Sequence, residues 1–533
     1  MKWITLGAFF LFACSKQEQA KAPSIVFEEA ASATGLVFQH RSGAKGDFFM
    51  PEIMGAGVAL FDMDNDGDLD VLLVQSGDLN QPGAVSGNKL FRNELVPSGR
   101  LRFTDISEGS GIEGTGYGMG AAVADIDNDG KLDVLVTNYG QSYLYRNLGN
   151  GKFQGVPVGP AKQWSSSASF LDYDRDGWPD LMLLSYVDFS TNQSKHCKAP
   201  TGEDDYCTPK AYPALSARLF HNNKGSFVDV TKQAGIDRAR GPGLGVVAFD
   251  ANQDGYLDLF VANDTERNHL WLNQKNGSFV EAGLAAGLAY SEDGLAKAGM
   301  GVALGDYDND GDEDLIVLNL MREGASLFRN DGKGNFRDVS KQSRIHALTY
   351  LFTGFGVAFA DFDNDGFEDL FLANGAVTLR PEQRGQSKPF RETKLVLRNQ
   401  GDGTFVDVSG AAGPSLSVGE VSRGLAIGDI DNDGRVDVIV TNNDGAVRLL
   451  LNRSPQQGWL KVHVREAGAA VQVDQGPLKV SRRDSSYASA IDLTLHFGLG
   501  SREPGEVKIQ GVDGRVRVIR KPNRNVMIEA KTQ

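Results

Sequence analysis

One acidic nine-residue unit occurs seven times in this chain and limits the possible fold more than any other feature. Its pattern is Asp-x-Asp-x-Asp-Gly-x-x-Asp, with Asn252 in place of the second Asp in the fourth copy, and successive copies begin 47 to 78 residues apart. Two like charges about 4 Å apart repel each other by roughly 4 kcal/mol at an effective dielectric of 20. A bound cation is therefore expected to hold the carboxylates of each copy together. The copies are 62–70, 125–133, 172–180, 250–258, 306–314, 361–369 and 429–437.

Each acidic unit lies between apolar runs of β-type residues, such as "GVALF" before the first copy and "VLLV" after it. Two further segments also occur seven times each, and both have the residue pattern of β-strands. Four strands per unit, repeated seven times, are typical of propeller blades. We predict an all-β fold with a seven-bladed β-propeller over residues 24–455. The Leu-x-x-Asn segments end at Asn93, Asn147, Asn222, Asn273, Asn330, Asn399 and Asn452, and the Phe-led strands open at Phe27, Phe103, Phe153, Phe227, Phe279, Phe336 and Phe405.

The order of these segments predicts how the ring closes. The chain begins with a Phe-led strand at Phe27, and its last repeat stops at Asn452 without one. We expect the first strand to complete the last blade, because closure protects sheet edges that would otherwise be open. After this repeat, residues 456–533 form short β-type segments and are predicted to be a small C-terminal β domain.

The acidic loops are predicted to bind up to seven structural Ca²⁺ ions. Side-chain oxygens at positions 1, 3, 5 and 9 and the backbone carbonyl of position 7 form an all-oxygen cage, which suits Ca²⁺. Zn²⁺ would require His or Cys, which the loops lack, and an EF-hand would require Glu where the first loop has Leu73. Position 7 varies freely, as expected if only its backbone binds. The expected ligands are Asp62, Asp64, Asp66, Asp68, Asp70, Asp125, Asp127, Asp129, Lys131, Asp133, Asp172, Asp174, Asp176, Trp178, Asp180, Asp250, Asn252, Asp254, Tyr256, Asp258, Asp306, Asp308, Asp310, Asp312, Asp314, Asp361, Asp363, Asp365, Phe367, Asp369, Asp429, Asp431, Asp433, Arg435 and Asp437.

The N-terminus has the pattern of a secretory signal. Lys2 precedes an apolar stretch that is too short to span a bilayer, and "LFAC" resembles a bacterial lipobox ending at Cys14. We predict a signal peptide over 1–13, lipidation of Cys14 and a flexible tether over 14–23. The alternative is an ordinary signal peptide with an incidental cysteine. The lipoprotein interpretation predicts a cell-envelope location, weakly favouring the outer membrane.

Cys197 and Cys207 are the remaining cysteines, and their spacing in an exported chain predicts a local disulfide. A zinc site that includes His196 is the alternative, but a convincing set of four ligands is missing. The pair lies in one of two insertions, 184–217 and 375–394, which are either functional loops or surface decoration.

Composition argues against nucleic acid as a partner, because the net charge of −15 disfavours phosphate contacts. Seven Ca²⁺ ions would largely offset that charge. The chain has no Gly-x-Ser-x-Gly elbow, phosphate-binding loop or zincin motif. The Leu-x-x-Asn strand makes His221 structural, and packing is favoured over chemistry for His496.

These motifs resemble the FG-GAP/VCBS repeat propellers and, more specifically, the cartilage acidic protein-like (ASPIC/UnbV) family. The resemblance rests on the segment from Phe27 to Asp70 and on "LHFGLG" at 495–500. Two segments depart from the family pattern, "RRDSSYASA" at 482–490 and "IQGVDGRV" at 509–516. The family resemblance implies calcium binding and an extracytoplasmic setting, but no defined reaction.

Two functions fit the sequence. The first is a lipid-anchored calcium-binding propeller that binds an unidentified protein or carbohydrate, in adhesion or in an envelope complex. The second is a metal-dependent carbohydrate-active enzyme of the lyase or dehydratase type. Catalysis would require basic groups clustered at one pocket, and the candidates are His40, His346, Arg380 and Arg384.

Overall fold

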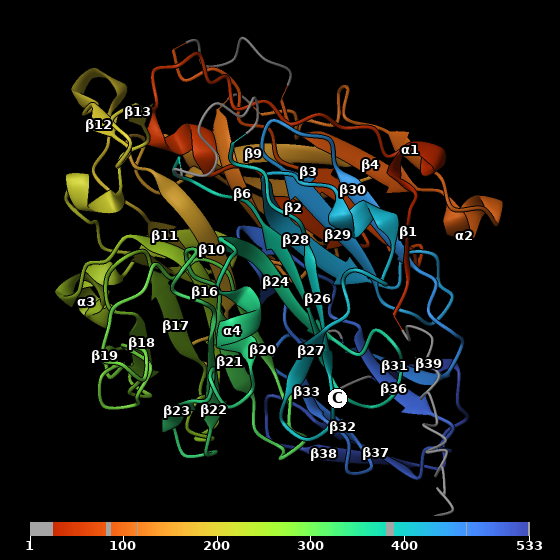
Figure 1. The fold of residues 1–533 in the computed structure, drawn as a ribbon. Helices are drawn as coiled ribbons and strands as arrows, with labels where there is room; N and C mark the ends of the chain where they lie inside the picture. Colours follow the sequence, from red (N-terminus) through yellow and green to blue (C-terminus); the bar gives the residue numbers. More distant parts are fainter. Residues whose placement is uncertain (1–24, 81–86, 115, 380–388, 465, 531–533) are drawn as a thin grey trace, which may run out of the picture.

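The computed structural model describes residues 25–80, 87–114, 116–379, 389–464 and 466–530. Strands dominate these residues, which confirms the all-β prediction (Figure 1). The predicted signal peptide, Cys14 and the tether lie outside the described residues, as do Arg380 and Arg384. Where the structure describes the chain, helical structure is limited to short turns: α1 (Ala31–Thr34), α2 (Leu95–Ser98), α3 (Thr231–Ala234), α4 (Ile345–Thr349), η1 (Met50–Ile53), η2 (Thr191–Gln193), η3 (Pro209–Ala211), η4 (Ile236–Arg238) and η6 (Pro414–Ser417).

In the described part of the chain, seven antiparallel sheets contain four repeat strands each, with the acidic loop between the first and second strand. We number the sheets and their loops in chain order. The strands are β2 (Val58–Phe61), β3 (Asp70–Leu73), β4 (Lys89–Asn93) and β5 (Phe103–Asp105) in sheet 1; β6 (Tyr117–Ala124), β7 (Asp133–Tyr139), β8 (Ser142–Gly149) and β9 (Lys152–Val158) in sheet 2; β10 (Ser165–Leu171), β11 (Asp180–Ser185), β14 (Arg218–Asn223) and β15 (Ser226–Asp229) in sheet 3; β16 (Gly243–Phe249), β17 (Asp258–Asn263), β18 (His269–Asn273) and β19 (Phe279–Glu281) in sheet 4; β20 (Val302–Gly305), β21 (Asp314–Val317), β22 (Ser326–Asn330) and β23 (Phe336–Asp338) in sheet 5; β24 (Gly354–Ala360), β25 (Asp369–Asn374), β26 (Leu395–Asn399) and β27 (Phe405–Asp407) in sheet 6; and β28 (Ser422–Gly428), β29 (Asp437–Asn442), β30 (Arg448–Asn452) and β1 (Phe27–Glu29) in sheet 7.

The sheets are arranged around a closed ring. The first repeat strand of each sheet contacts that of the next, from β2 through β6, β10, β16, β20 and β24 to β28, which contacts β2 again. The N-terminal strand completes sheet 7 as predicted, with Phe27 paired to Asn452. Closure of this kind joins the two ends of the propeller region and leaves fewer sheet edges open.

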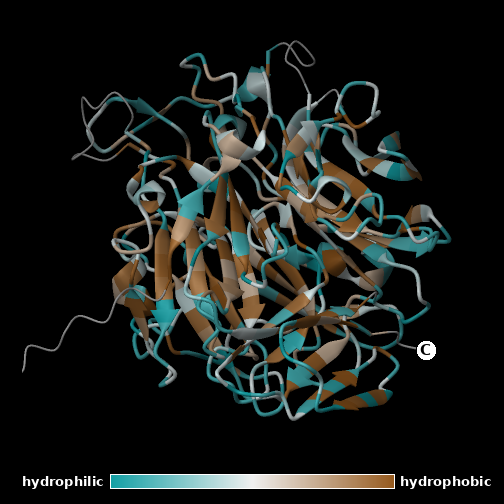
Figure 2. Cartoon of the chain, turned by 90° about the vertical axis from the view of Figure 1, so that its right-hand side faces the viewer, coloured by the Kyte–Doolittle hydropathy of each residue, from teal (hydrophilic) through white to brown (hydrophobic). Residues whose placement is uncertain are grey.

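Apolar runs in the second strands follow from packing on both faces of each sheet. In β7, Val134 and Val136 belong to the core between sheets 1 and 2, whereas Leu135 belongs to the core between sheets 2 and 3. Strands that are covered on both faces lose the alternation of polar and apolar residues. Figure 2 shows these apolar strands inside the molecule and polar loops at its edges.

The C-terminal region forms two small sheets beside the acidic loops, with a core that includes Leu460, Val471 and Phe497. Figure 1 shows these strands in blue, at the end of the propeller opposite the β12–β13 insertion. The strands are β31 (Gly458–Val464), β36 (Leu495–Gly500) and β39 (Val526–Ala530) in one sheet, and β32 (Ala470–Val473), β33 (Leu478–Val480), β37 (Glu506–Gln510) and β38 (Val516–Arg520) in the other.

Residues 484–490 leave this domain and enter the centre of the propeller, which the sequence did not predict. β34 (Asp484–Ser485) pairs with β35 (Ser489–Ala490), and β35 adds to sheet 1 in parallel with β2. Tyr487 is fully buried between them. Its ring lies 4.9 Å from that of Phe355, and its hydroxyl donates to the Met54 carbonyl at 2.9 Å. We call residues 484–490 the plug.

The plug contacts all seven sheets. Beyond its pairing with β2, it accepts hydrogen bonds from inner-strand groups of the other six sheets. These strands line the ring, so their free N–H groups require acceptors that the ring itself does not supply. The donors are Ala121 N to Ala488 O, Ser169 Oγ to Asp484 Oδ2, Ala248 N to Asp484 Oδ2, Val302 N to Ser486 O, Val357 N to Ser486 Oγ and Leu425 N to Ser489 Oγ.

The insertion at 184–217 contains the predicted disulfide, which is confirmed between Cys197 and Cys207. It closes a hairpin of β12 (Cys197–Lys198) and β13 (Asp204–Asp205). Both thiols are used in this bond, so the zinc alternative with His196 is wrong. Among the described residues, no helix has the length and apolar character of a membrane span.

Candidate metal centres

Each acidic loop is held in shape by its own carboxylates. In loop 5, Asp306 accepts hydrogen bonds from the backbone N–H groups of Asp310 (2.9 Å) and Gly311 (3.0 Å). Asp310 then accepts from the N–H of Asp312 at 3.1 Å. The same bonds from positions 5 and 6 to position 1 recur in the other loops.

Position 4 of every loop has a left-handed backbone, which Asn tolerates better than most residues. The glycine at position 6 is also left-handed, with φ between 85° and 99°. The recurring Asn-Asp-Gly pattern therefore suits the conformation of the turn, which Arg175 and Gln253 also adopt in loops 3 and 4. The position-4 residues are Asn65, Asn128, Arg175, Gln253, Asn309, Asn364 and Asn432.

The aspartate at position 9 begins the second strand and is at most 2% exposed in every loop. Burial raises the pKa of Asp70 and Asp314 to about 9, of Asp180 to about 8 and of Asp133 and Asp258 to about 7. A buried carboxylate with such a pKa is ionised at neutral pH only if a cation or hydrogen-bond donors compensate its charge.

Several loop oxygens are buried and have no hydrogen-bond partner among the described residues. Four of them occupy the same position, Oδ1 of position 3, in loops 2, 5, 6 and 7. Buried polar atoms are normally paired, so these four oxygens are free to bind a ligand from outside the chain. The four residues are Asp127, Asp308, Asp363 and Asp431.

The loop carboxylates also gather closely enough to share an ion. In loop 5, ligand atoms of Asp306, Asp308 and Asp314 lie within 4.8 Å of one another, and groups in loops 1, 2 and 3 meet the same criterion. The donors are oxygens only, apart from His221 beside loop 3. Hard oxygen donors fit Ca²⁺, which accepts a flexible coordination geometry.

His221 is placed at loop 3, where sequence reasoning had assigned it to a structural strand. Its Nδ1 lies 3.4 Å from Asp174 Oδ2 and 3.2 Å from Asp180 Oδ1. The corresponding strand position is arginine in sheets 1, 2, 5 and 6. Arg329 and Arg398 each pair with the position-3 and position-5 carboxylates of their own loop. The sequence signal for these arginines is the Arg-Asn pair at the end of the strand, in Leu-Phe-Arg-Asn at 327–330 and Val-Leu-Arg-Asn at 396–399.

The asparagine of each Leu-x-x-Asn strand supports its loop. Its backbone N–H donates to the position-9 aspartate, as Asn399 does to Asp369 at 2.8 Å. Its side-chain amide also donates to the preceding loop in six of the seven sheets within the described residues, as Asn399 does to the Tyr307 carbonyl at 2.8 Å. The motif therefore joins neighbouring loops around the ring. The other bonds to a preceding loop come from Asn93, Asn147, Asn222, Asn273 and Asn452.

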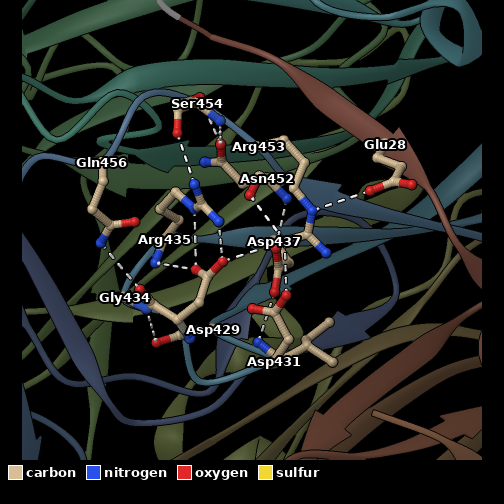
Figure 3. Close-up of polar contacts among 12 residues, drawn as sticks. Glu28, Asp429, Asp431, Gly434, Arg435, Asp437, Asn452, Arg453, Ser454 and Gln456 are labelled. Atoms are coloured by element: carbon tan, nitrogen blue, oxygen red, sulfur yellow. Dashed lines mark hydrogen bonds and ion pairs between the residues drawn. The ribbon is translucent and has the colours of Figure 1, made fainter. Parts of the chain in front are cut away.

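Figure 3 shows these relations in loop 7. Asn452 N donates to Asp437 Oδ1 at 2.7 Å, and Arg453 Nη1 lies 2.8 Å from Asp431 Oδ2. Arg435, the position-7 residue, directs its guanidinium to Asp433 and to the Ser454 carbonyl. Its side chain therefore engages carboxylate and backbone oxygens of the loop's surroundings, and only its backbone carbonyl is available as the predicted ligand.

The "LHFGLG" strand, β36, lies against loops 6 and 7. His496 Nε2 donates to the Gly434 carbonyl at 2.9 Å, and burial lowers the pKa of His496 to about 3, so the ring is neutral. A Cβ atom on Gly498 would lie 1.9 Å from Asp361 Oδ2, so only glycine allows this approach. Gly500 N donates to the Asn364 carbonyl at 2.7 Å. The motif is thus a docking strand for two acidic loops.

The catalytic candidates do not form one described cluster. His40 is buried, with Nε2 2.9 Å from Ser76 Oγ and Nδ1 accepting from Asp444 N. His346 belongs to α4 and packs beside Tyr350. The two histidines therefore have different contact partners and share none of those named here. Nothing in the described residues assembles the predicted catalytic site.

Comparisons with known proteins agree with the repeat pattern. A family profile described as "FG-GAP-like repeat" matches residues 62–136, 125–183, 250–317, 306–372 and 391–440. Cartilage acidic protein 1 of Xenopus tropicalis is 24% identical over 513 residues, which cover 87% of this chain and 71% of that protein.

Two solved structures illustrate how distant the structural neighbours are. One is an Agrocybe aegerita lectin that recognises non-reducing terminal N-acetylglucosamine (15% identity, TM-score 0.38, 86% of this chain and 100% of the lectin). The other is the rhamnogalacturonan lyase YesW (13% identity, TM-score 0.38, 74% of this chain and 71% of the lyase). At such scores, neither likeness carries an argument about function.

Proposed function

The chain belongs to the family of FG-GAP-like repeat proteins, and on that premise we propose that it is a calcium-binding propeller that serves as a binding module in the cell envelope. The observation that carries the proposal is the set of buried, unpartnered Oδ1 atoms at position 3 of loops 2, 5, 6 and 7. Carboxylates at positions 1, 3, 5 and 9, with the carbonyl of position 7, would hold Ca²⁺ in six loops, and in loop 4 the amide oxygen of Asn252 would replace the carboxylate of position 3. The ion would supply charge compensation for the buried aspartates.

The proposed role of the ions is structural. The loops join neighbouring sheets through asparagine hydrogen bonds, and the C-terminal domain docks on loops 6 and 7. Ions that fix the loops would therefore also fix the ring and its docked domain. Binding of a protein or carbohydrate partner, with Cys14 as the lipid anchor, completes the proposal.

Metal analysis and calorimetry test the calcium part. We expect several Ca²⁺ ions per purified molecule. Because a ligand that binds only the folded state stabilises it by mass action, EGTA should lower the melting temperature by at least about 15 °C. Fewer than two ions per molecule, or an unchanged melting temperature, would contradict the proposal.

A pull-down from native envelope, with and without chelator, tests the binding part. The mature protein, lipidated and anchored, is the bait, and a Cys14→Ser form is the soluble control. Partners that are captured with calcium and lost after chelation support a calcium-ordered binding module. Capture that is unaffected by complete metal removal would oppose it.

A further inference from the structure

A cavity of about 670 Å³ lies between the loop face of the propeller and the C-terminal domain. Its lining includes carboxylates of the acidic loops, among them Asp62 and Asp125, and the basic residues Lys461, Lys479, Arg482 and Arg483. Its volume falls within the range of about 300–1,000 Å³ that is usual for small-molecule sites. The cavity is therefore large enough for a small organic ligand.

The plug makes this cavity more suitable for a ligand than the axis of the ring. Tyr487 fills the centre of the propeller and is fully buried, and Ala488 is 2% exposed. Main-chain and hydroxyl acceptors of the plug are engaged by inner-strand N–H groups. A ligand on the axis would have to displace these bonds, whereas a ligand in the cavity would not.

The four cations that line the cavity are not equivalent. Three of them hold a carboxylate of the propeller closely, but Arg483 has only Asp492, at 3.8 Å. Nη1 of Arg483 is buried and has no hydrogen-bond partner among the described residues. Nη1 of Arg482 is also buried without a hydrogen-bond partner among the described residues, and Arg482 is only 8% exposed. The close pairs are Lys461–Asp429 (2.7 Å), Lys479–Glu368 (2.5 Å) and Arg482–Glu313 (2.5 Å).

Burial also makes the charge of Arg483 costly. The side chain is 13% exposed, and burial lowers its pKa, while Asp492, Asp125 and Asp62 act in the opposite direction. A guanidinium binds carboxylate and phosphate groups through paired, charge-assisted hydrogen bonds. Such a group in the cavity would supply the acceptors that Arg483 lacks.

We propose that this cavity binds a small molecule through a carboxylate or phosphate group held by Arg483. The inference rests on the proposed binding role and names the place and ligand chemistry for it. Calcium in loops 1 and 2 would neutralise Asp62 and Asp125 beside Arg483, so anion binding should strengthen when these loops are filled.

Isothermal titration of the mature protein in millimolar calcium tests the proposal with D-glucuronate, D-glucose 6-phosphate and D-glucose. These probes share one hydroxylated ring and differ in the group at C6, so their comparison isolates the anion. We expect at least one anionic probe to bind about 10- to 100-fold more tightly than glucose. Which of the two binds more tightly distinguishes carboxylate from phosphate recognition.

Two substitutions locate the effect. Arg483→Gln should remove the preference for the anion, whereas Arg483→Lys, which keeps the positive charge, should retain part of it. Arg520→Gln is the matched control, because Arg520 is 83% exposed on β38. Equal binding of glucose and both anions, binding of none of them, or an unchanged preference in a folded Arg483→Gln protein would overturn the proposal.

Failure of this inference is separable from failure of the calcium proposal. Calcium content is measured on the same protein preparation. Calcium-loaded protein without anion preference overturns the cavity inference alone. Arg483-dependent anion binding by protein that lacks calcium overturns the calcium proposal alone.

Discussion

Loops 2 and 6 have nearly the same sequence but different surroundings. Loop 2, "DIDNDGKLD", leaves Asn128, Asp129 and Gly130 exposed. In loop 6, "DFDNDGFED", the docking strand β36 covers Asp361, which is 2% exposed. Burial raises the pKa of Asp125, and it raises the pKa of Asp361 well above its usual range.

The comparison shows that one motif can lie in two different environments, and in the proposed calcium sites the environment would decide how tightly the ion is held. Charge compensation matters more where water is excluded, because the low local dielectric strengthens each interaction. We therefore expect loop 6 to hold its ion as part of the docked structure and loop 2 to exchange its ion with solvent. The predictions below test this difference, from the largest expected effect to the smallest.

Tyr487→Ala would test whether the plug keeps loop 6 covered while loop 2 stays exposed. The substitution removes a fully buried aromatic ring and should cost about 4 kcal/mol of unfolding free energy. If the plug holds the C-terminal domain in place, the amides of Asp365 and Gly366 in loop 6 should then exchange hydrogen as fast as those of Asp129 and Gly130 in loop 2. Denaturant unfolding and hydrogen exchange measure the two effects.

Val518→Ala is the control for this change, because Val518 is 44% exposed on β38. It should alter neither stability nor exchange by much. Loop 6 amides that stay protected in a destabilised Tyr487→Ala protein would show that the plug does not maintain the docking.

Gly498→Val would separate β36 from loop 6 directly. A side chain here meets Asp361 Oδ2 at 1.9 Å and the backbone of Asn364 at 2.6 Å. Overpacking of this kind should cost about 3 kcal/mol and speed calcium release from loop 6. Calcium release after mixing with a fluorescent chelator measures the rate, and Gly410→Ala, at a site with open space, is the control. An unchanged release rate in the folded variant would mean that β36 does not cover the ion.

Asp363→Asn and Asp127→Asn compare position 3 in the two loops. Asp363 is 6% exposed and pairs with Arg398 at 2.7 Å, so its loss should cost about 2 kcal/mol at saturating calcium. Asp127 lies in the more exposed loop, and its loss should cost less than about 1 kcal/mol. Thermal melts of both variants provide the test.

Loop 4 supplies a natural reference for these substitutions, because Asn252 already occupies position 3 there. An amide is therefore compatible with the turn, and a large effect would report lost charge and ligation instead of misfolding. Equal costs for the two variants would remove the distinction between the loops.

Glu52→Gln would test whether a carboxyl group outside the acidic loops makes the stability of the protein depend on pH. Burial raises the pKa of Glu52 to about 7, against the lowering effect of the Tyr206 hydroxyl. The folded protein then keeps a proton between pH 4.5 and about 7 that the unfolded chain releases, so stability falls as pH rises through this window. The Gln variant should lack this fall and be more stable by about 1 kcal/mol at pH 8.

Thermal melts at pH 5 and pH 8 in saturating calcium measure this effect. At pH 5 the two proteins should melt at nearly the same temperature, because Glu52 is protonated in the folded wild type. A variant with the same pH dependence as wild type would place the titrating group elsewhere.

Local patterns were sufficient to predict the repeats. The pairing of Phe27 with Asn452 follows from a unit that recurs in fixed order, whereas the bond from Asn452 to Asp437 became evident only in the structure. The disulfide of Cys197 and Cys207 followed from spacing and compartment. Arg329 and Arg398 were missed, although their strand position recurs, because arginine beside an acidic loop was not considered as a partner.

Repetition by itself determined the architecture of this protein. Each unit contains its own strands, turn and acidic residues, so the same local structural signals occur seven times along the chain. Only the tertiary structure decided that residues 484–490 fill the ring and that β36 covers loops 6 and 7. Those contacts join residues more than 60 positions apart and occur once each, so no period, spacing or composition could reveal them. The incomplete pairing of Arg483 in its cavity has the same origin, because it depends on which carboxylates the docked domain leaves out of reach.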